Sequence, residues 1–428
     1  MQFKYLIKKI FLSTVAKFVS SLGVLFFNFI TIYLTDKNTL GMISSVLSLI
    51  VFLSIFTKFG LNHATLKYSS IFYENNDINN INQLVLHATI ISGIISIFVS
   101  FLLIFFENEI AIEIYKDNQI NGVLKIFALS LPFFTFLQLQ KSLFKSFKKP
   151  ELSNLADIGT ILFLICIIIL FLQMININIS IYRISICFLF SCLFIFSLNN
   201  FLLFFIILKD YKILKLDRLL FVKNKMVKSL LDYFSIDFVN YANVWGCIFL
   251  CSFFYDSTTV GEFTSVYWLA FSLLFFPLIL NSIYGPYYAI ESKKNSLFKQ
   301  NKLFYQNRNI SLVITTPIFL TLFIFSDFFL RVILDIKSYE FNIVFKILLI
   351  NSFIRIIFGP QNLFLSMTNE EKHLKFILII CSLLQAILML FFIIYYDLIF
   401  FTASFVIANF IKHLWLQKAM NASLRLKI

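Results

Sequence analysis

Twelve long apolar runs fill most of this 428-residue chain. Each run holds about 20 residues, the length that an α-helix needs to cross the hydrocarbon core of a bilayer. The runs are continuous and do not alternate between apolar and polar residues, as the strands of a membrane barrel would. We therefore expect an all-α integral membrane protein with transmembrane helices at residues 10–34, 41–59, 83–106, 123–144, 155–175, 184–208, 230–254, 263–284, 310–329, 341–365, 376–395 and 398–416.

The amount and the placement of charge support this class. Only 14% of the residues are charged, whereas soluble domains average about 25%. If the N-terminus is cytoplasmic, 26 of the 36 Lys and Arg residues lie in or at the edge of cytoplasmic segments. Five lie in the loops on the outer side of the membrane, and five lie within spans. The positive-inside rule then predicts a multi-pass protein of the bacterial cytoplasmic membrane with both termini in the cytoplasm. The net charge of +14 is explained in this way and gives no reason to expect a nucleic-acid partner.

A basic linker divides the chain into two halves of six spans each. We expect an N-terminal six-helix lobe at residues 1–208, a cytoplasmic linker at 209–229 and a C-terminal six-helix lobe at 230–428. The stretches LTDKNTLGMISSV (34–46) and FYDSTTVGEFTSV (254–266) match at an offset of 220 residues, which indicates an internal repeat. The residues that match at this offset include Asp36 and Asp256, Thr39 and Thr259, Gly41 and Gly261, Tyr68 and Tyr288, and Asn75 and Asn295.

Six helices per copy give both copies the same direction in the membrane. Such a parallel repeat is a common plan for transporters, with the substrate site between the halves. The Asp-x-x-Thr-x-Gly pattern itself is typical of a turn that begins a helix, so we expect these residues to be structural.

An arginine in the tenth span is the strongest candidate for a cavity. An ionisable group at the centre of a spanning helix costs at least about 2.5–3.5 kcal/mol, so it usually faces a partner or a polar cavity. Arg355 belongs to a polar stripe at helical spacing that also contains Asn351, Ser352, Gly359, Asn362 and Ser366. We expect Arg355 and Asn351 to line a substrate cavity; polar contacts between helices are the competing explanation. Gly359 and Pro360 should weaken the helix just beyond.

Two further charges lie within spans. Lys17 stands in the first span, and Asp237 stands in the seventh with Asn240 on the same face. They could pair with each other across the two-fold pseudo-axis that would relate the two copies of the repeat. They could also act separately, as an anion contact and a coupling acid. Side chains of this kind can also reach the membrane interface, so the sequence leaves the role of Lys17 and Asp237 open.

Motifs for catalysis, nucleotides and metals do not occur in the sequence. There is no GxxxxGK[ST] phosphate loop, no GxSxG and no HExxH. The four His are scattered and the six Cys fall in apolar runs without metal-ligand spacing. We therefore expect neither an enzyme nor a cofactor nor a metal site.

Three stretches resemble Wzx-type polysaccharide flippases of the multidrug/oligosaccharidyl-lipid/polysaccharide exporter superfamily. They are FYDSTTVGEFTSVYWLAFSLLFFP (254–277), KFGLNHATLKYSS (58–70) and LPFFTFLQLQKSLFKSFKKPELSN (131–154). The resemblance implies a MATE-like fold with two lobes around a central cavity that alternates its access. It also implies an anionic cargo, an undecaprenyl-diphosphate-linked oligosaccharide repeat unit that is flipped for O-antigen or capsule synthesis. Neither Arg355 nor Lys17 maps onto a fixed motif of that family.

Other functions remain open at this level. A multidrug or small-solute exporter could use the same fold. A membrane polysaccharide polymerase is disfavoured because the predicted outside loops are short. Membrane lipids and other polysaccharide-assembly proteins are the further partners that the resemblance implies, while the sugar, the coupling ion and the oligomeric state are not determined by the sequence.

Overall fold

The computed structural model describes residues 2–75, 77–210, 224–293, 297–367 and 371–425. These residues contain helices and no strand. Within these described ranges, ten helices are long and apolar enough to cross a membrane. A further span is broken into Leu230–Val244 and Gly246–Phe254, and Ile158–Met174 is a shorter apolar helix. These segments coincide with the twelve predicted spans and confirm an all-α, multi-pass membrane protein.

The chain forms two compact units. The first extends to Tyr241 and includes Asp256–Val260, and the second holds Ala242–Tyr255 and Gly261–Ile428. By their contacts, residues 224–241 therefore group with the first unit. Most of the linker predicted at 209–229 lies outside the described residues, so the lobe boundaries of the sequence analysis remain a prediction.

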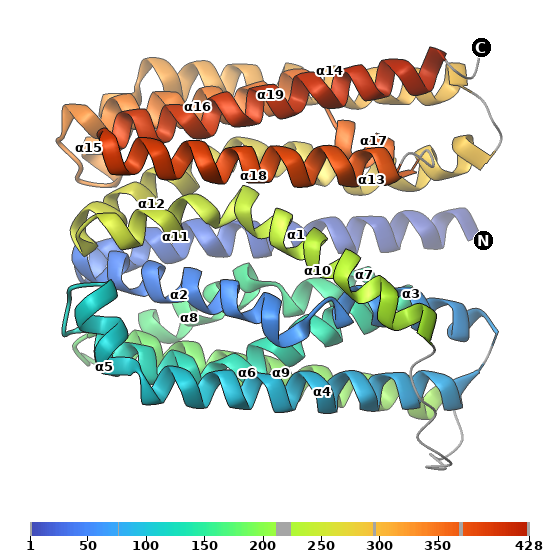
Figure 1. Ribbon diagram of the computed structural model, residues 1–428, viewed down its shortest axis with the longest axis horizontal. Coiled ribbons are helices and arrows are strands. Elements are labelled where there is room, and N and C mark those ends of the chain that lie inside the picture. The colour runs from blue at the N-terminus through green and yellow to red at the C-terminus, as the bar shows by residue number, and fades with distance from the viewer. Residues whose placement is uncertain (1, 76, 211–223, 294–296, 368–370, 426–428) are drawn as a thin grey trace. The chain divides into compact units, whose positions relative to one another are not determined.

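The first unit contains the helices up to most of α10 (Figure 1). They are α1 (Gln2–Leu34), α2 (Lys37–Lys58), α3 (Leu61–Glu74), α4 (Ile78–Phe105), α5 (Glu107–Glu109) with a π-turn at Ile110–Ile114, α6 (Ile120–Ser146), α7 (Pro150–Ser153) with a 3₁₀ turn at Asn154–Ala156, α8 (Ile158–Met174), α9 (Ile181–Asp210) and α10 (Asn224–Val244).

Helix α6 lies at the centre of the first unit, where it contacts α2, α3, α4 and α9. Figure 1 shows α4, α6 and α9 running side by side. Helix α4 faces α6 with small residues, since Ser92, Ser96 and Ser100 are buried, and the Ser100 hydroxyl donates to the Ala128 carbonyl. Its large apolar side chains, such as Phe101, are exposed on the opposite face. This is the arrangement expected where lipid covers the outside, because small residues allow helix backbones to approach closely.

Both copies of the repeated corner begin a helix. The Asp36 carboxylate accepts a hydrogen bond from the Thr39 backbone N–H at 2.6 Å, and Asp256 accepts one from the Thr259 N–H at 3.3 Å. Each aspartate thereby satisfies a backbone donor that the first helical turn leaves free. The structural role predicted for the Asp-x-x-Thr pattern is confirmed.

The second unit contains the remaining helices. They are α11 (Gly246–Phe254), α12 (Ser257–Phe271) with a 3₁₀ turn at Ser272–Leu274, α13 (Phe275–Lys293), α14 (Leu297–Ile324), α15 (Ser326–Ile333), α16 (Tyr339–Phe358), α17 (Gln361–Met367), α18 (Glu371–Tyr395) and α19 (Leu398–Arg425). Helix α19 packs along α18 and α16 (Figure 1). Tyr288, Phe304, Phe364 and Leu416 are at most 1% exposed and form the core beneath these helices.

Two glycines set the distance between α1 and α8. A Cβ added to Gly159 would lie 1.8 Å from the Ser20 carbonyl oxygen, and one added to Gly23 would lie 2.0 Å from the Gly159 carbonyl oxygen. Both contacts are with backbone, so no side-chain movement can relieve them. We expect Gly159→Ala to lower the free energy of unfolding by about 3 kcal/mol or more, because the two helices must separate.

The thermal unfolding midpoint of the detergent-purified chain measures this effect. Gly285→Ala is the matched control, since its added Cβ would meet only the Leu363 side chain, at 3.5 Å. Equal midpoints for Gly159→Ala and Gly285→Ala would contradict this account of the α1–α8 packing.

A buried carboxylate ties α1, α6 and α8 together. Asp157 stands just before α8 and is 5% exposed. Its carboxylate accepts from the Lys17 ammonium group of α1 at 2.7 Å and from the Lys141 ammonium group of α6. Lys17, a cavity candidate by its place in the sequence, has this aspartate as its described partner. Burial alone would raise the pKa of Asp157, but the two ammonium groups hold it below its usual value.

We expect Asp157→Asn to lower the free energy of unfolding by about 2 kcal/mol or more, because two lysines lose their counter-ion. A lowered pKa in the folded chain stabilises it above the unfolded carboxyl pKa of about 4. The advantage of the wild type should therefore shrink as the pH falls below about 4. Thermal unfolding at several pH values tests this. Glu74→Gln, which breaks an exposed pair with Lys148, should change the midpoint little.

Candidate functional site

A cavity of about 420 Å³ with both apolar and polar lining residues lies within the second unit. It is large enough for a charged headgroup and is formed by the end of α12, by α13 and α14, by the junction of α16 and α17, and by α19. Its lining residues are Phe271, Leu274, Pro277, Leu278, Asn281, Ser311, Arg355, Ile356, Gly359, Pro360, Gln361, Asn362, Leu363, Ser366, Lys412 and His413.

The break between α16 and α17 gives the cavity its polar wall. Helix α16 ends at Phe358 because Gly359 has φ +75°, a conformation that residues with a side chain rarely adopt. A Cβ at Gly359 would also come within 3.0 Å of the Arg308 side chain. The predicted weakening of the helix at Gly359 and Pro360 is confirmed.

Arg355 lies in the last turn of α16 and reaches the cavity without a counter-ion. Within the described part of the chain its guanidinium group makes no hydrogen bond or ion pair. Its Cζ atom lies 5.7 Å from the centroid of the Phe271 ring, within the range of a cation–π contact. All the donors of this guanidinium group therefore remain available to a ligand.

Lys412 is the second cation of the cavity. It projects from α19, is 4% exposed and donates to the side-chain oxygen of Asn243 at 2.5 Å and to that of Asn409. These amide oxygens position the ammonium group but do not neutralise it. A buried cation held only by neutral groups favours the approach of an anion.

His413 follows Lys412 on α19 and packs its ring on Phe358, with the ring centroids 5.5 Å apart and the planes 13° from parallel. Its Nδ1 atom lies 3.0 Å from the Gln361 side-chain oxygen. Gln361 belongs to α17, so this contact joins α17 to α19 at the edge of the cavity.

The cavity is therefore lined by two basic side chains. Its described lining contains Arg355 and Lys412 but no Asp or Glu. Away from bulk water such charges bind an anion more strongly, and the guanidinium fork suits phosphate or carboxylate oxygens. The described residues hold no group of three or more His, Cys, Asp or Glu side chains placed to bind a metal ion.

The predicted candidates fall in different places. Arg355 lines this cavity, as do Gly359, Asn362 and Ser366 of its predicted stripe. Asn351 is buried one turn earlier on α16 and does not line the cavity, and its side-chain oxygen has no hydrogen-bond partner among the described residues. Lys17, Asp237 and Asn240 belong to the first unit.

The pairing of Lys17 with Asp237 that we considered is wrong. Lys17 pairs with Asp157, as described above, and Asp237 has its own partners. The error arose because the repeat offset gives equivalent positions in two copies, whereas ion pairs are decided by packing within one unit. Asn240, three residues after Asp237, is exposed.

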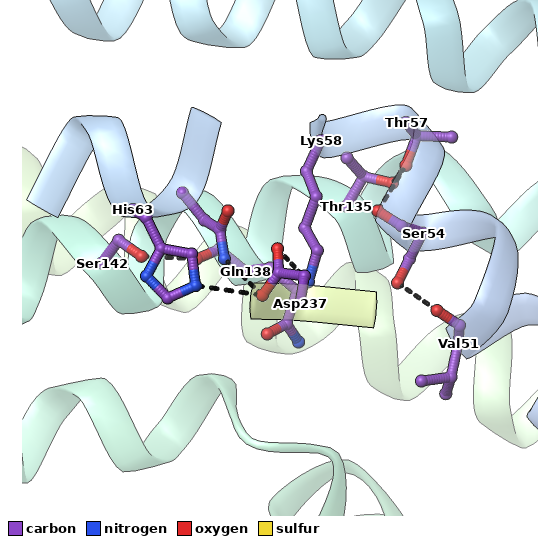
Figure 2. Close-up of polar contacts among 10 residues, drawn as sticks. Val51, Ser54, Thr57, Lys58, His63, Thr135, Gln138, Ser142 and Asp237 are labelled. Carbon is purple, nitrogen blue, oxygen red and sulfur yellow. Dashed lines mark hydrogen bonds and ion pairs between the residues drawn. The ribbon is translucent and has the colours of Figure 1, made fainter. Parts of the chain in front are cut away.

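Asp237 is held by residues on both sides of the turn between α2 and α3 (Figure 2). Its carboxylate lies 3.3 Å from the Lys58 ammonium group and 3.1 Å from His63 Nε2, and it accepts a weaker bond from the Asn62 amide at 3.4 Å. Asp237 and Lys58 are both 8% exposed. The pair is thus a buried, neutralised contact that fastens α10 to α2 and α3.

The turn itself requires glycine. Gly60 has φ +75°, and a Cβ at this position would lie 2.7 Å from both the Leu230 carbonyl oxygen and the Tyr233 Cβ. Helix α10 therefore packs directly on the turn, which explains why Asp237 lies between Lys58 and His63.

Sequence reasoning missed Lys412 and His413 as site residues. A signal was present, since both stand inside the apolar run 398–416, where ionisable groups are costly. Only the packing of α19 on α16 brings them to Arg355.

Neither a family model nor a curated protein matches this sequence. Solved structures do match along almost the whole chain. Lipid II flippase MurJ in an inward closed conformation matches with a TM-score of 0.71 and 17% identity over 96% of this chain and 87% of that one. A mutant of the Vibrio cholerae MATE transporter VcmN matches with a TM-score of 0.66 and 12% identity over 98% of both chains.

A transporter of the MOP superfamily from Pyrococcus furiosus matches with a TM-score of 0.64 and 13% identity over 97% of this chain and 96% of that one. At such identities the likeness concerns the fold alone. The chain therefore has the fold shared by MATE transporters and the flippase MurJ, with a positively charged cavity inside its second unit.

Proposed function

We propose that this protein is a flippase for an anionic lipid-linked cargo and works by alternating access. The observation that carries the proposal is the cavity in which Arg355 and Lys412 have no counter-ion among the described residues. The cost of keeping two cations in such a place is offset when a ligand brings negative charge. In this role Arg355 would bind the anionic group, and Lys412 would share it.

The cargo we propose is an undecaprenyl-diphosphate-linked oligosaccharide repeat unit, moved across the bacterial cytoplasmic membrane for O-antigen or capsule synthesis. The resemblance of residues 58–70, 131–154 and 254–277 to Wzx-type flippases supports this cargo. The fold shared with a lipid II flippase is consistent with it. The distribution of Lys and Arg supports a cytoplasmic position for both termini.

Export of drugs or small solutes is the alternative on the same fold. An exporter of cationic drugs would need a carboxylate in its site, and the described lining of this cavity has none. Asp237, which the sequence left open as a coupling acid, is already paired with Lys58. The cavity therefore favours an anionic cargo.

Arg355→Gln should reduce export by about 10–100-fold, because a charge-assisted contact with the cargo is lost. The assay is complementation of a deletion strain, with lipid-linked repeat units measured in each leaflet of the cytoplasmic membrane. Repeat units should accumulate in the cytoplasmic leaflet, and Arg355→Lys should restore part of the export.

Arg331→Gln is the control, because Arg331 is exposed and pairs with Asp327. Full export by Arg355→Gln at a normal protein level would remove Arg355 from the site. Complete but unpolymerised units in the outer leaflet of the deletion strain would instead indicate a polymerase.

For Asp237 we propose a structural role. Asp237→Asn should lower the free energy of unfolding by about 3 kcal/mol, because Lys58 stays buried without a counter-ion. Lys58→Met combined with Asp237→Leu should recover much of this loss, as apolar replacements of a buried pair often do. Thermal unfolding and the export assay applied to both variants separate the roles. A stable double variant that exports nothing would show that the pair takes part in transport.

A further inference from the structure

The hydrogen bonds around Gln361 fix which nitrogen of His413 carries a proton. The Gln361 side-chain nitrogen lies 3.3 Å from the His413 backbone carbonyl oxygen and 2.8 Å from the Gln417 side-chain oxygen. A backbone carbonyl can only accept, so the orientation of the Gln361 amide is determined. Its oxygen then faces His413 Nδ1 at 3.0 Å, and Nδ1 must be the donor.

The other ring nitrogen is consequently an unused acceptor. A neutral imidazole carries one proton, and the bond to Gln361 places that proton on Nδ1. In that form Nε2 carries a lone pair and no proton. His413 Nε2 is buried and has no hydrogen-bond partner among the described residues, although His413 lines a cavity rich in donors. A buried acceptor without a hydrogen-bond partner destabilises the protein by its lost hydration free energy. Binding of a donor restores a hydrogen bond and offsets this loss.

We propose that His413 Nε2 accepts a hydrogen bond from a sugar hydroxyl of the cargo while Arg355 and Lys412 hold the neighbouring phosphate. The site would thus recognise a glycosyl phosphate, not an anion alone. This inference rests on the proposed function and deepens it. The two cations supply donors for phosphate oxygens, and Nε2 supplies the acceptor that a hydroxyl needs and that a phosphate dianion cannot use.

The ring position supports this division of roles. The Phe358 ring against one face of the imidazole, together with the bond from Nδ1 to Gln361, holds the orientation of the ring and hence the direction of the Nε2 lone pair. Gln361 is therefore a positioning residue for His413. Nε2 is buried in this structure, so neighbouring side chains must move before a hydroxyl can reach it.

The test compares two phosphate monoesters of similar size on the purified full-length chain. Glucose 1-phosphate carries ring hydroxyls, whereas cyclohexyl phosphate carries none. We expect calorimetry to show glucose 1-phosphate binding about tenfold more tightly to the wild type, the usual effect of one buried hydrogen bond that is made or left unmade. Arg355→Gln should weaken the binding of both probes.

Two substitutions of His413 then distinguish the role of Nε2 from that of Nδ1. In His413→Asn the amide can keep the contact with Gln361, but nothing replaces Nε2. The two probes should therefore bind this variant with about equal affinity. In His413→Gln the amide oxygen can take the place of Nε2, so part of the preference should remain. Thermal unfolding checks that both variants fold, and only folded variants are compared.

Three outcomes would overturn the inference. If the wild type binds both probes equally, and both depend on Arg355, the hydroxyl acceptor is wrong while the anion site stands. If His413→Asn keeps the full preference for glucose 1-phosphate, other polar groups bind the sugar hydroxyls. If neither probe binds, both the glycosyl phosphate inference and the anion site of the proposed function fail.

Discussion

A membrane interior offers no water to a buried charge, so each charge must find its partner within the protein or in a ligand. This constraint accounts for the polar architecture of the chain. In the first unit the buried carboxylates of Asp157 and Asp237 are each contacted by two basic side chains, lysines at Asp157 and a lysine and a histidine at Asp237. The desolvation of these charges is offset by their attraction, and the contacts fasten helices to one another.

The two cations of the cavity in the second unit are held differently. Arg355 rests against an aromatic ring and Lys412 against two amide oxygens, none of which carries a negative charge. Neutral contacts hold these side chains in place without cancelling their field. The first unit thus neutralises its buried charges, whereas Arg355 and Lys412 have no counter-ion among the described residues, which is why we propose that an anion binds there.

Backbone geometry supports both arrangements. Gly60 lets the chain bend sharply between α2 and α3 where α10 packs on it, which places Lys58 and His63 on either side of Asp237. Gly359 ends α16 just after the turn that carries Arg355, and the chain continues into α17 along the wall of the same cavity. In each case a glycine at positive φ brings a charged side chain and its neighbours to one point, because other residues rarely adopt that conformation.

The sequence by itself determined the class, the positions of the spans and the helix starts at Asp36 and Asp256, since these depend on local hydrophobicity and local hydrogen bonds. The sequence also indicated Arg355 as a site residue, because burying a charge within an apolar span costs free energy however the helix packs. Only the tertiary structure decided that Lys17 is neutralised by Asp157, that Asp237 is neutralised by Lys58, and that Lys412 and His413 join Arg355. These contacts depend on which helix faces pack together. Contacts between residues far apart in the chain produce no periodic pattern in the sequence, so the sequence does not predict them.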